Sequence, residues 1–305
     1  MKSIKNEITD WIRGYKFGYT IKDKLILLTY ILNGIIILTL LYVISGKEKT
    51  GKVILSRPNL LNWIPTKKIT INRDGVLLSV PTVIDYMIFV KLDWENEEKE
   101  FAIKHSMNDG LILDVGSNVG YYTCILAKKY QNSKIISVEA SPSIFDILKD
   151  NCKLNNFSNV ILYNYAITDK DDTEIDFYKH DSMSTTDKQT LTDWSIPQNQ
   201  IKKEKTKTLT IDKLLKDENI GKIQFCKIDI EGAEIMALRG ARYTLKKKLI
   251  QNMMIEYHSY SNRDYIVNLL KEMDYLVSVK ERDILFENKD HANGHIFATL
   301  TNQSD

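Results

Sequence analysis

Cysteine is scarce in this sequence, and neither sign of charge is in excess. There are 3 cysteines among 305 residues, Cys124, Cys152 and Cys226, and no two have the spacing of a metal-binding pair. We therefore expect reduced, packed thiols, as on the cytosolic side of a cell. Lysine and arginine total 42 against 40 aspartate and glutamate, so the bulk charge does not indicate a nucleic-acid-binding protein. The hydrophobic fraction of 43% can supply a real core.

A glycine-punctuated stretch, residues 111–123 (LILDVGSNVGYYT), is predicted to form a strand, a turn and a helix. Its first residues suit a strand buried on both faces, and Asp114 marks the carboxyl end of that strand. Gly116 and Gly120 let the backbone turn tightly beside a ligand, and Asn118 would cap or open the helix. Nicotinamide and flavin sites use three glycines, so this pair points away from a dinucleotide.

A second acidic residue, Glu139, ends the next strand-like run, KIISVE. A carboxylate at this position can accept hydrogen bonds from both ribose hydroxyls of an adenosine group. The alternative is an ordinary loop between a strand and a helix, because glycine turns discriminate poorly between sites.

The chain is predicted to have three parts. Residues 1–46 form an arm and a hydrophobic segment, residues 47–105 a small β-rich preface, and residues 106–305 the main domain. The run at 25–45 has no charge and as one helix would be about 31 Å long, close to the thickness of a bilayer core. It is a candidate membrane anchor, transmembrane or monotopic, or else a helix packed against the rest of the protein. Lysine and arginine bracket both of its ends, so its orientation is not readable.

Strand and helix patterns alternate from residue 111 onward, which predicts a doubly wound α/β sheet. Ligands bind such sheets beyond the carboxyl ends of the strands, where Asp114, Glu139, Asp229 and His258 should converge. Residues 180–204 are polar and aperiodic, and form either a substrate lid or a disordered surface loop. The expected strands are LILDV, KIISVE, NVILYNYA, KIQFCKIDI and QNMMIEYH, and the expected helices 121–130, 144–155, 234–248 and 263–273.

The segment KIDIEGAE carries the densest chemistry after the glycine turn. Lys227, Asp229 and Glu231 should alternate along a strand and project to one side, with the lysine offsetting the burial of both carboxylates. Gly232 permits a close backbone approach, and Glu234 opens the next helix. The alternative is a purely structural ion-pair cluster.

The strand that follows ends in MMIEYH and offers two more polar groups. Glu256 and His258 alternate along it and so face the same way. They would offer a carboxylate partner for Lys227 and an imidazole near the crevice. The acidic stretch at 93–100 is assigned no chemistry, because such stretches are usually solvated loops.

Several of these motifs, in order, resemble the FkbM-type S-adenosylmethionine-dependent methyltransferases. The resemblance covers about residues 108–258 and implies a class I methyltransferase fold, Rossmann-like and doubly wound. The arm, the hydrophobic segment and the insertion lie outside it. Ser117 is small like the residue more usual at its position, and Ala140 replaces a common proline. The motifs are DVGSNVGYYT, VEASP, NCKLNN, NYAITDKDD, TLTIDKLL, KIDIEGAEIMALRGA and IEYH.

The resemblance also implies roles for residues. S-adenosylmethionine would lie across the glycine turn with its ribose on Glu139, and Asp229, Glu231 and Glu234 match the acidic motif that faces methyl donor and acceptor. Ala166 matches a position near the adenine. The residues matched to cofactor binding are Asp114, Gly116, Asn118, Gly120, Glu139, Ala166 and Asp229.

The expected reaction is O-methylation of a hydroxyl on a sugar, a glycan or a lipid-linked glycan. A hydroxyl must lose its proton as it attacks, so a base is needed, and Glu231 or His258 is the candidate. Asp229 and Glu234 would orient donor and acceptor, and no metal is required. The alternatives are a membrane-tethered protein that binds the cofactor without turnover, and a nucleic-acid methyltransferase. The chain has no Asn/Asp-Pro-Pro-aromatic motif for transfer to amino groups. The protein is expected at the cytoplasmic face of a membrane or in the cytoplasm.

Overall fold

The chain divides into two compact units, which are described separately. The first comprises Met1–Trp94 with His180–Met183 and Lys188–Lys202, and the second comprises the remainder from Glu95 onward. The computed structural model describes residues 18–29, 32, 69–80, 95–180, 183–185, 201–282 and 293–301.

The first unit contains a β-hairpin of β1 (Ile69–Arg73) and β2 (Val76–Val80), paired antiparallel. Asp74 and Gly75 both have positive φ, 49° and 80°, the backbone of a tight hairpin turn. This confirms the strands expected around Asp74-Gly75. The second alternating run, residues 86–94, lies outside the described residues.

The start of the hydrophobic segment is helical over residues 21–29. Thr20 and Asp23 cap this helix reciprocally: the Thr20 N–H donates to Asp23 Oδ2 at 3.0 Å, and the Asp23 N–H donates to Thr20 Oγ1 at 3.1 Å. Within the described part of the chain, no helix is long and apolar enough to cross a membrane. Of the predicted segment 25–45, residues 30, 31 and 33–45 lie outside the described part.

A seven-stranded sheet forms the centre of the second unit. Its order is β12-β13-β11-β10-β3-β4-β5, and all neighbours are parallel except β13, which runs antiparallel to both β11 and β12. The strand order reverses between β3 and β10, which makes their carboxyl ends the switch point. The strands are β3 (Leu111–Val115), β4 (Lys134–Val138), β5 (Val160–Tyr163), β10 (Ile223–Ile228), β11 (Ile250–Tyr257), β12 (Tyr275–Glu281) and β13 (Gly294–Leu300).

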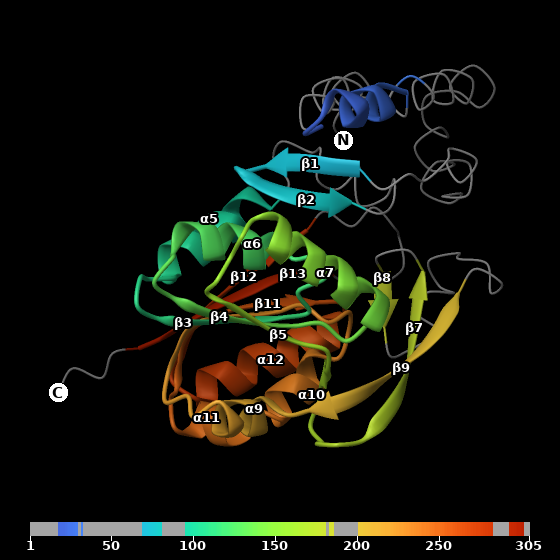
Figure 1. Ribbon diagram of the computed structural model, residues 1–305. Coiled ribbons are helices and arrows are strands. Elements are labelled where there is room, and N and C mark those ends of the chain that lie inside the picture. Colours follow the sequence, from blue (N-terminus) through green and yellow to red (C-terminus); the bar gives the residue numbers. More distant parts are fainter. Residues whose placement is uncertain are drawn as a thin grey trace, which may run out of the picture. The chain divides into compact units, whose positions relative to one another are not determined.

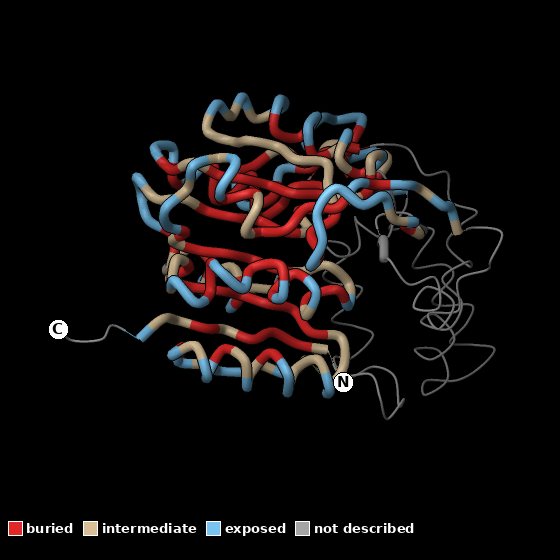
Figure 2. Tube along the Cα trace, turned by 90° about the horizontal axis from the view of Figure 1, so that it is seen from below, coloured by how far each residue is buried: buried red, intermediate tan, exposed pale blue. Residues whose placement is uncertain are grey.

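Helices cover both faces of this sheet (Figure 1). One face carries α5 (Asn96–His105), α6 (Tyr121–Lys129) and α7 (Pro142–Leu154). The other carries α9 (Ile211–Asp217), α10 (Glu234–Arg239), α11 (Arg242–Lys246) and α12 (Tyr260–Glu272). The central strands are buried on both sides, as Figure 2 shows, which explains their nearly continuous apolar sequences. The predicted doubly wound α/β sheet is therefore confirmed.

Several predicted boundaries differ from the structure. The helix expected over 234–248 is two helices, α10 and α11, which are separated at Gly240, where a side chain would lie 2.0 Å from the Thr168 carbonyl oxygen. Residues 96–105, assigned to the β-rich preface, form α5. Helices α7 and α12 begin two and three residues earlier than expected, at caps made by Ser141 and Ser259.

The strand expected over NVILYNYA also divides. β5 ends at Tyr163, and Ala166 belongs to β6 (Ala166–Ile167), in a second sheet of order β6-β9-β7-β8. The predicted insertion, 180–204, overlaps the edges of this sheet, and its residues 181, 182 and 186–200 lie outside the described ones. The other strands are β7 (Glu174–His180), β8 (Met183–Thr185) and β9 (Lys202–Leu209).

The three cysteines are buried free thiols, as expected. Cys226 lies in β10 with no exposed surface, and burial raises the pKa of its thiol. Such thiols pack as small apolar groups.

Candidate active site

The turn between β3 and α6 is built on two glycines with positive φ. Gly116 has φ 78° and Gly120 φ 91°, a conformation that side chains rarely adopt. The Gly116 N–H donates to the Val138 carbonyl at 2.9 Å. A Cβ on Gly116 would lie 1.8 Å from the Asp229 carbonyl oxygen, and one on Gly120 would lie 2.5 Å from Leu148 Cδ1. The turn therefore packs directly against the Asp229 segment and against Leu148 of α7.

Asn118 positions the turn but does not cap the helix. Its φ is 50°, its N–H donates to Glu139 Oε2 at 2.9 Å, and its Oδ1 accepts from the Val119 N–H at 2.7 Å. The N-cap of α6 is Gly120. The predicted capping role was wrong, because the Asn118 side chain is used within the turn itself.

Glu139 follows β4, and its carboxylate is held by backbone donors. Oε2 accepts from Asn118, and Oε1 accepts from the Ser141 N–H at 2.8 Å. The carbonyls of Glu139 and Ala140 accept from Asn164 Nδ2 at 2.8 and 3.0 Å. Asn164 lies two residues before the buried Ala166. Its side chain therefore links the segment that leads to Ala166 with the end of β4, where Glu139 lies.

Asp114, in β3, is buried with 1% exposure. Thr123 Oγ1 donates to its Oδ2 at 2.6 Å, whereas Oδ1 is buried without a hydrogen-bond partner. Burial raises the pKa of Asp114, although Lys227 opposes that rise. Lys227 is the register partner of Asp114 across β3 and β10.

Thr123 supplies a test of how Asp114 is supported. Thr123→Val keeps the shape but removes the hydroxyl that donates to Asp114 Oδ2, so we expect it to lower the free energy of unfolding by about 1 to 3 kcal/mol. Thr123→Ser keeps the hydroxyl and should cost about 1 kcal/mol or less. Urea denaturation of both variants measures the difference, and equal stabilities would show that the hydroxyl does not support the carboxylate.

The turn after β10 does not follow the predicted alternation. β10 ends at Ile228, so Asp229 and Glu231 lie beyond the strand, and Glu231 has φ 52° with Gly232 at 102°. Lys227 Nζ does contact Asp229 Oδ2 at 2.9 Å. Burial opposes the charge on Asp229, but Lys227 and then His258 outweigh it and lower the pKa of Asp229.

Glu231 turns toward His258 instead. Its Oε2 lies 3.2 Å from His258 Nε2, and Glu234 Oε1 lies 3.4 Å from His258 Nδ1. Glu234 is fully buried, and its Oε1 accepts from the N–H groups of Ile230 and Gly232 at 3.3 and 3.0 Å. Burial disfavours a charge on His258, but Glu231, Glu234 and Glu256 raise its pKa well above the usual value.

Glu256 is paired with Arg282 rather than with Lys227. Arg282 Nη1 contacts Glu256 Oε1 at 2.8 Å, and Glu256 also forms a side-chain hydrogen bond with Asp229. Burial and the charge of Asp229 raise the pKa of Glu256 well above its usual value. The prediction placed Glu256 on the correct face but missed the arginine, which follows β12 and lies far away in sequence.

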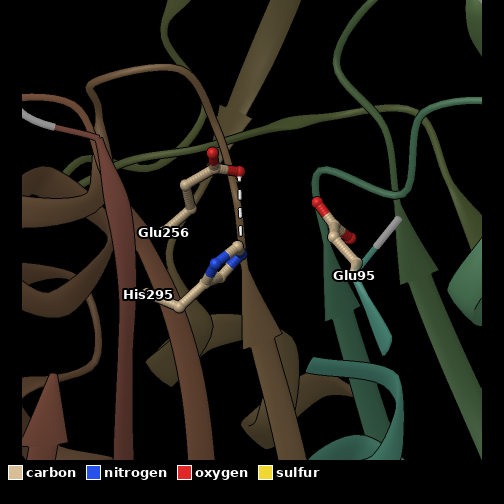
Figure 3. Close-up of side chains that lie close together, drawn as sticks. All are labelled: Glu95, Glu256 and His295. Atoms are coloured by element: carbon tan, nitrogen blue, oxygen red, sulfur yellow. Dashed lines mark ion pairs between the residues drawn. The ribbon is translucent and has the colours of Figure 1, made fainter. Parts of the chain in front are cut away.

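A further group of charged residues was missed entirely. Glu256 and His295 lie opposite each other on β11 and β13, with His295 Nε2 3.9 Å from Glu256 Oε2, and Glu95 enters from the start of α5 (Figure 3). Arg282 also contacts Glu95, and Tyr122 donates to Glu95 Oε2 at 2.9 Å. The stretch 93–100, taken as a solvated loop, therefore supplies a buried ionic group beneath the site.

Glu98 belongs to the same group. Its Oε1 lies 3.2 Å from His295 Nδ1. Burial works against its charge, but His295 and Lys280 lower its pKa to about 2. Helical spacing could have indicated from the sequence that Glu98 is buried, because Glu98 lies four residues before the buried Ala102 in α5.

The predicted residues thus gather into two adjoining groups. Asp114, the glycine turn and Glu139 lie at the ends of β3 and β4, and Asp229, Glu231, Glu234 and His258 lie at the ends of β10 and β11. The two groups meet where Gly116 packs on the Asp229 carbonyl. Ala166 lies apart on β6, joined to this region through Asn164.

Comparison with known proteins agrees with this geometry. The family described as "Methyltransferase FkbM domain" matches residues 114–280, more than half of the chain. The chain belongs to the FkbM methyltransferase family. It is accordingly an S-adenosylmethionine-dependent methyltransferase. The match begins at Asp114, the first residue of the group at the ends of β3 and β4, which we call the donor-side group.

Two curated relatives are also methyltransferases by name. Methyltransferase 1 of Beauveria bassiana (strain ARSEF 2860) is 29% identical over 201 residues, which cover 61% of this chain and 80% of that protein. The hexuronic acid methyltransferase AglP of Haloferax volcanii is 24% identical over 178 residues, which cover 58% of this FkbM chain and 68% of that protein.

Among solved structures, similar chains include precorrin-6y C5,15-methyltransferase from Geobacter metallireducens GS-15. Its TM-score is 0.43 at 13% identity, covering 69% of this chain and 91% of that one. Another is M. jannaschii TYW2 in complex with AdoMet, with a TM-score of 0.39 at 14% identity, covering 77% and 86%.

The donor-side residues fit the family's cofactor. Asp114 Oδ1 is a buried acceptor still lacking a donor. The Glu139 carboxylate is fixed in orientation by two backbone N–H groups. S-adenosylmethionine carries ammonium and ribose hydroxyl donors, which such carboxylates accept.

Proposed function

We propose that this FkbM methyltransferase transfers the methyl group to a hydroxyl of a sugar or glycan. The observation that carries the proposal is the Asp229, Glu231, Glu234 and His258 group, which adjoins the glycine turn at the switch point of the sheet. The name of the Haloferax relative, a hexuronic acid methyltransferase, supports a sugar as the acceptor class.

On the donor side, the chain's own residues bind and orient the cofactor. Gly116, Asn118 and Gly120 form the turn that would hold it, and Glu139 would accept hydrogen bonds from its ribose. Asp114 offers its unpartnered oxygen to a donor on the ligand. Ala166 would lie near the adenine, with Asn164 as its link to Glu139. When bound, S-adenosylmethionine supplies an electrophilic methyl group on a sulfonium.

On the acceptor side, the hydroxyl must lose its proton as its oxygen attacks. His258 is the weaker candidate, because Glu231, Glu234 and Glu256 raise its pKa and so stabilise the protonated ring. Glu231 is the better candidate, since its side chain is 30% exposed and Nε2 of His258 fixes its orientation. Glu234 holds the ring from the other side, and Asp229 borders the donor.

Transfer of labelled methyl from S-adenosylmethionine to total lipid, glycan, protein and RNA fractions tests the acceptor class. We expect label in glycan or in lipid that loses its label on deglycosylation, and Glu231→Gln protein provides the background. Label confined to RNA or protein would contradict the proposal. Cofactor binding without label in any fraction would favour the non-catalytic alternative.

A further inference from the structure

Asp229, Glu231 and His258 form a compact group of potential metal ligands. Each offers one ligand atom, and these atoms all lie within 4.8 Å of one another. They come from the ends of two adjacent strands, β10 and β11. Their side chains remain 26%, 30% and 17% exposed, so a small molecule can reach the group.

The imidazole of His258 is oriented as a ligand would be. Nε2 faces Glu231 at 3.2 Å, and Nδ1 faces the fully buried Glu234 at 3.4 Å. Metal-bound histidines usually donate the other ring N–H to a carboxylate or carbonyl, which fixes ring and tautomer. Glu234 would be that carboxylate. Its Oε1 accepts hydrogen bonds from the N–H groups of Ile230 and Gly232.

Two buried atoms in the described part of this region also lack hydrogen-bond partners. They are Glu234 Oε2 and His258 Nδ1, and the latter lies 3.4 Å from the other oxygen of Glu234, Oε1. Buried polar atoms are rarely left in this state. A cation on Nε2 would leave the ring hydrogen on Nδ1, where the Glu234 carboxylate can accept it.

We infer that Asp229, Glu231 and His258 bind a divalent first-row cation such as Mn²⁺, and that the acceptor hydroxyl occupies an open position on it. Two carboxylates with one imidazole suit Mn²⁺ and its neighbours in the first transition row. Cation binding stands by itself, whereas the role of the hydroxyl rests on the proposed function.

The chemical step remains balanced with the cation present. The acceptor O–H bond breaks, and the proton passes to solvent water at the exposed edge of Glu231. The oxygen's electron pair forms the bond to the methyl carbon as the carbon–sulfur bond breaks, with that pair remaining on sulfur. The cation lowers the pKa of the hydroxyl, and Glu231 then acts as a ligand rather than as the direct proton acceptor.

The second candidate group in the described part of the chain, Glu95, Glu256 and His295, is already compensated. Arg282 contacts both Glu95 and Glu256. Its guanidinium lies against two residues of that group, whereas in the proposed group Lys227 Nζ contacts one residue, Asp229, at 2.9 Å. This group therefore serves as the matched control.

Titration of the full-length protein with Mn²⁺ alone, followed by the EPR signal of free Mn²⁺, tests the inference. We expect saturable binding at one site, lost in Glu231→Gln and in His258→Gln but kept in His295→Gln. Glu234→Gln should weaken binding about 10- to 100-fold. S-adenosylmethionine binding by each variant checks that it is folded.

Absence of saturable Mn²⁺ binding by the wild type would overturn the inference. Undiminished binding by both Glu231→Gln and His258→Gln, or loss only in His295→Gln, would do so as well. Methyl transfer to glycan by EDTA-treated protein that binds no Mn²⁺ would refute the cation and support the proposed function. Mn²⁺ binding at this group with methyl label only in RNA would support the cation site and refute methyl transfer to a glycan.

Discussion

Gly116→Ala should abolish S-adenosylmethionine binding and lower the free energy of unfolding by about 2 to 5 kcal/mol. The new Cβ would lie 1.8 Å from the Asp229 carbonyl oxygen and 2.9 Å from Ile230 Cγ2, on a residue with φ 78°. Backbone atoms cannot move aside as a flexible side chain can. The turn must therefore shift away from β10, which displaces both the donor-side backbone and Asp229.

Gly221→Ala is the matched control, because a Cβ at Gly221 would meet nothing within 4 Å. Calorimetry with S-adenosylmethionine and urea denaturation of both variants provide the two measurements. Wild-type cofactor affinity in Gly116→Ala would mean that the turn can relax without cost to the site. That result would remove the main structural reason for placing the cofactor at the Gly116 turn.

Glu231→Gln should lower kcat about 10²- to 10⁴-fold while leaving S-adenosylmethionine binding unchanged. The amide has nearly the same size but cannot take a proton, and it is a poor ligand for a divalent cation. Glu231 lies beyond β10 in a turn, and its carboxylate contacts His258 at the end of β11. The effect should therefore appear in turnover and not in cofactor affinity.

Single-turnover kinetics at saturating cofactor measure this effect. Lys248→Gln offers a control, since Lys248 pairs with the exposed Asp274 just before β11 begins, at the opposite end of that strand from His258. Full turnover by Glu231→Gln would exclude Glu231 both as proton acceptor and as essential ligand. Loss of cofactor binding instead would assign Glu231 to the donor side.

The strand, turn and helix at residues 111–129 could be predicted because their signals are local. Apolar residues buried on both faces, an acidic strand end and two glycines with positive φ all lie within a short stretch. The parallel arrangement then brought Glu139 and Asp229 to the same edge without further information. The same reasoning identified His258 next to the crevice.

The remaining features depend on contacts between distant segments. Arg282 reaches Glu95 and Glu256 only because β13 inserts antiparallel between β11 and β12. Nothing in the runs YLVSVK and HIFATL specifies that pairing. The break at Gly240 likewise reflects the close approach of the Thr168 carbonyl, which belongs to another part of the chain.

Because the strand order reverses between β3 and β10, the two turns at the proposed site lead to opposite faces of the sheet. The Gly116 turn leads into α6 on one face of the sheet, and the Asp229 turn leads into α10 on the other (Figure 1). Gly116 packs on the Asp229 carbonyl, so the second crossover can vary only where that contact is kept. Under the proposed function, grafting the β10–α10 loop between relatives with Asp229 retained is expected to change acceptor preference and to leave cofactor affinity unchanged.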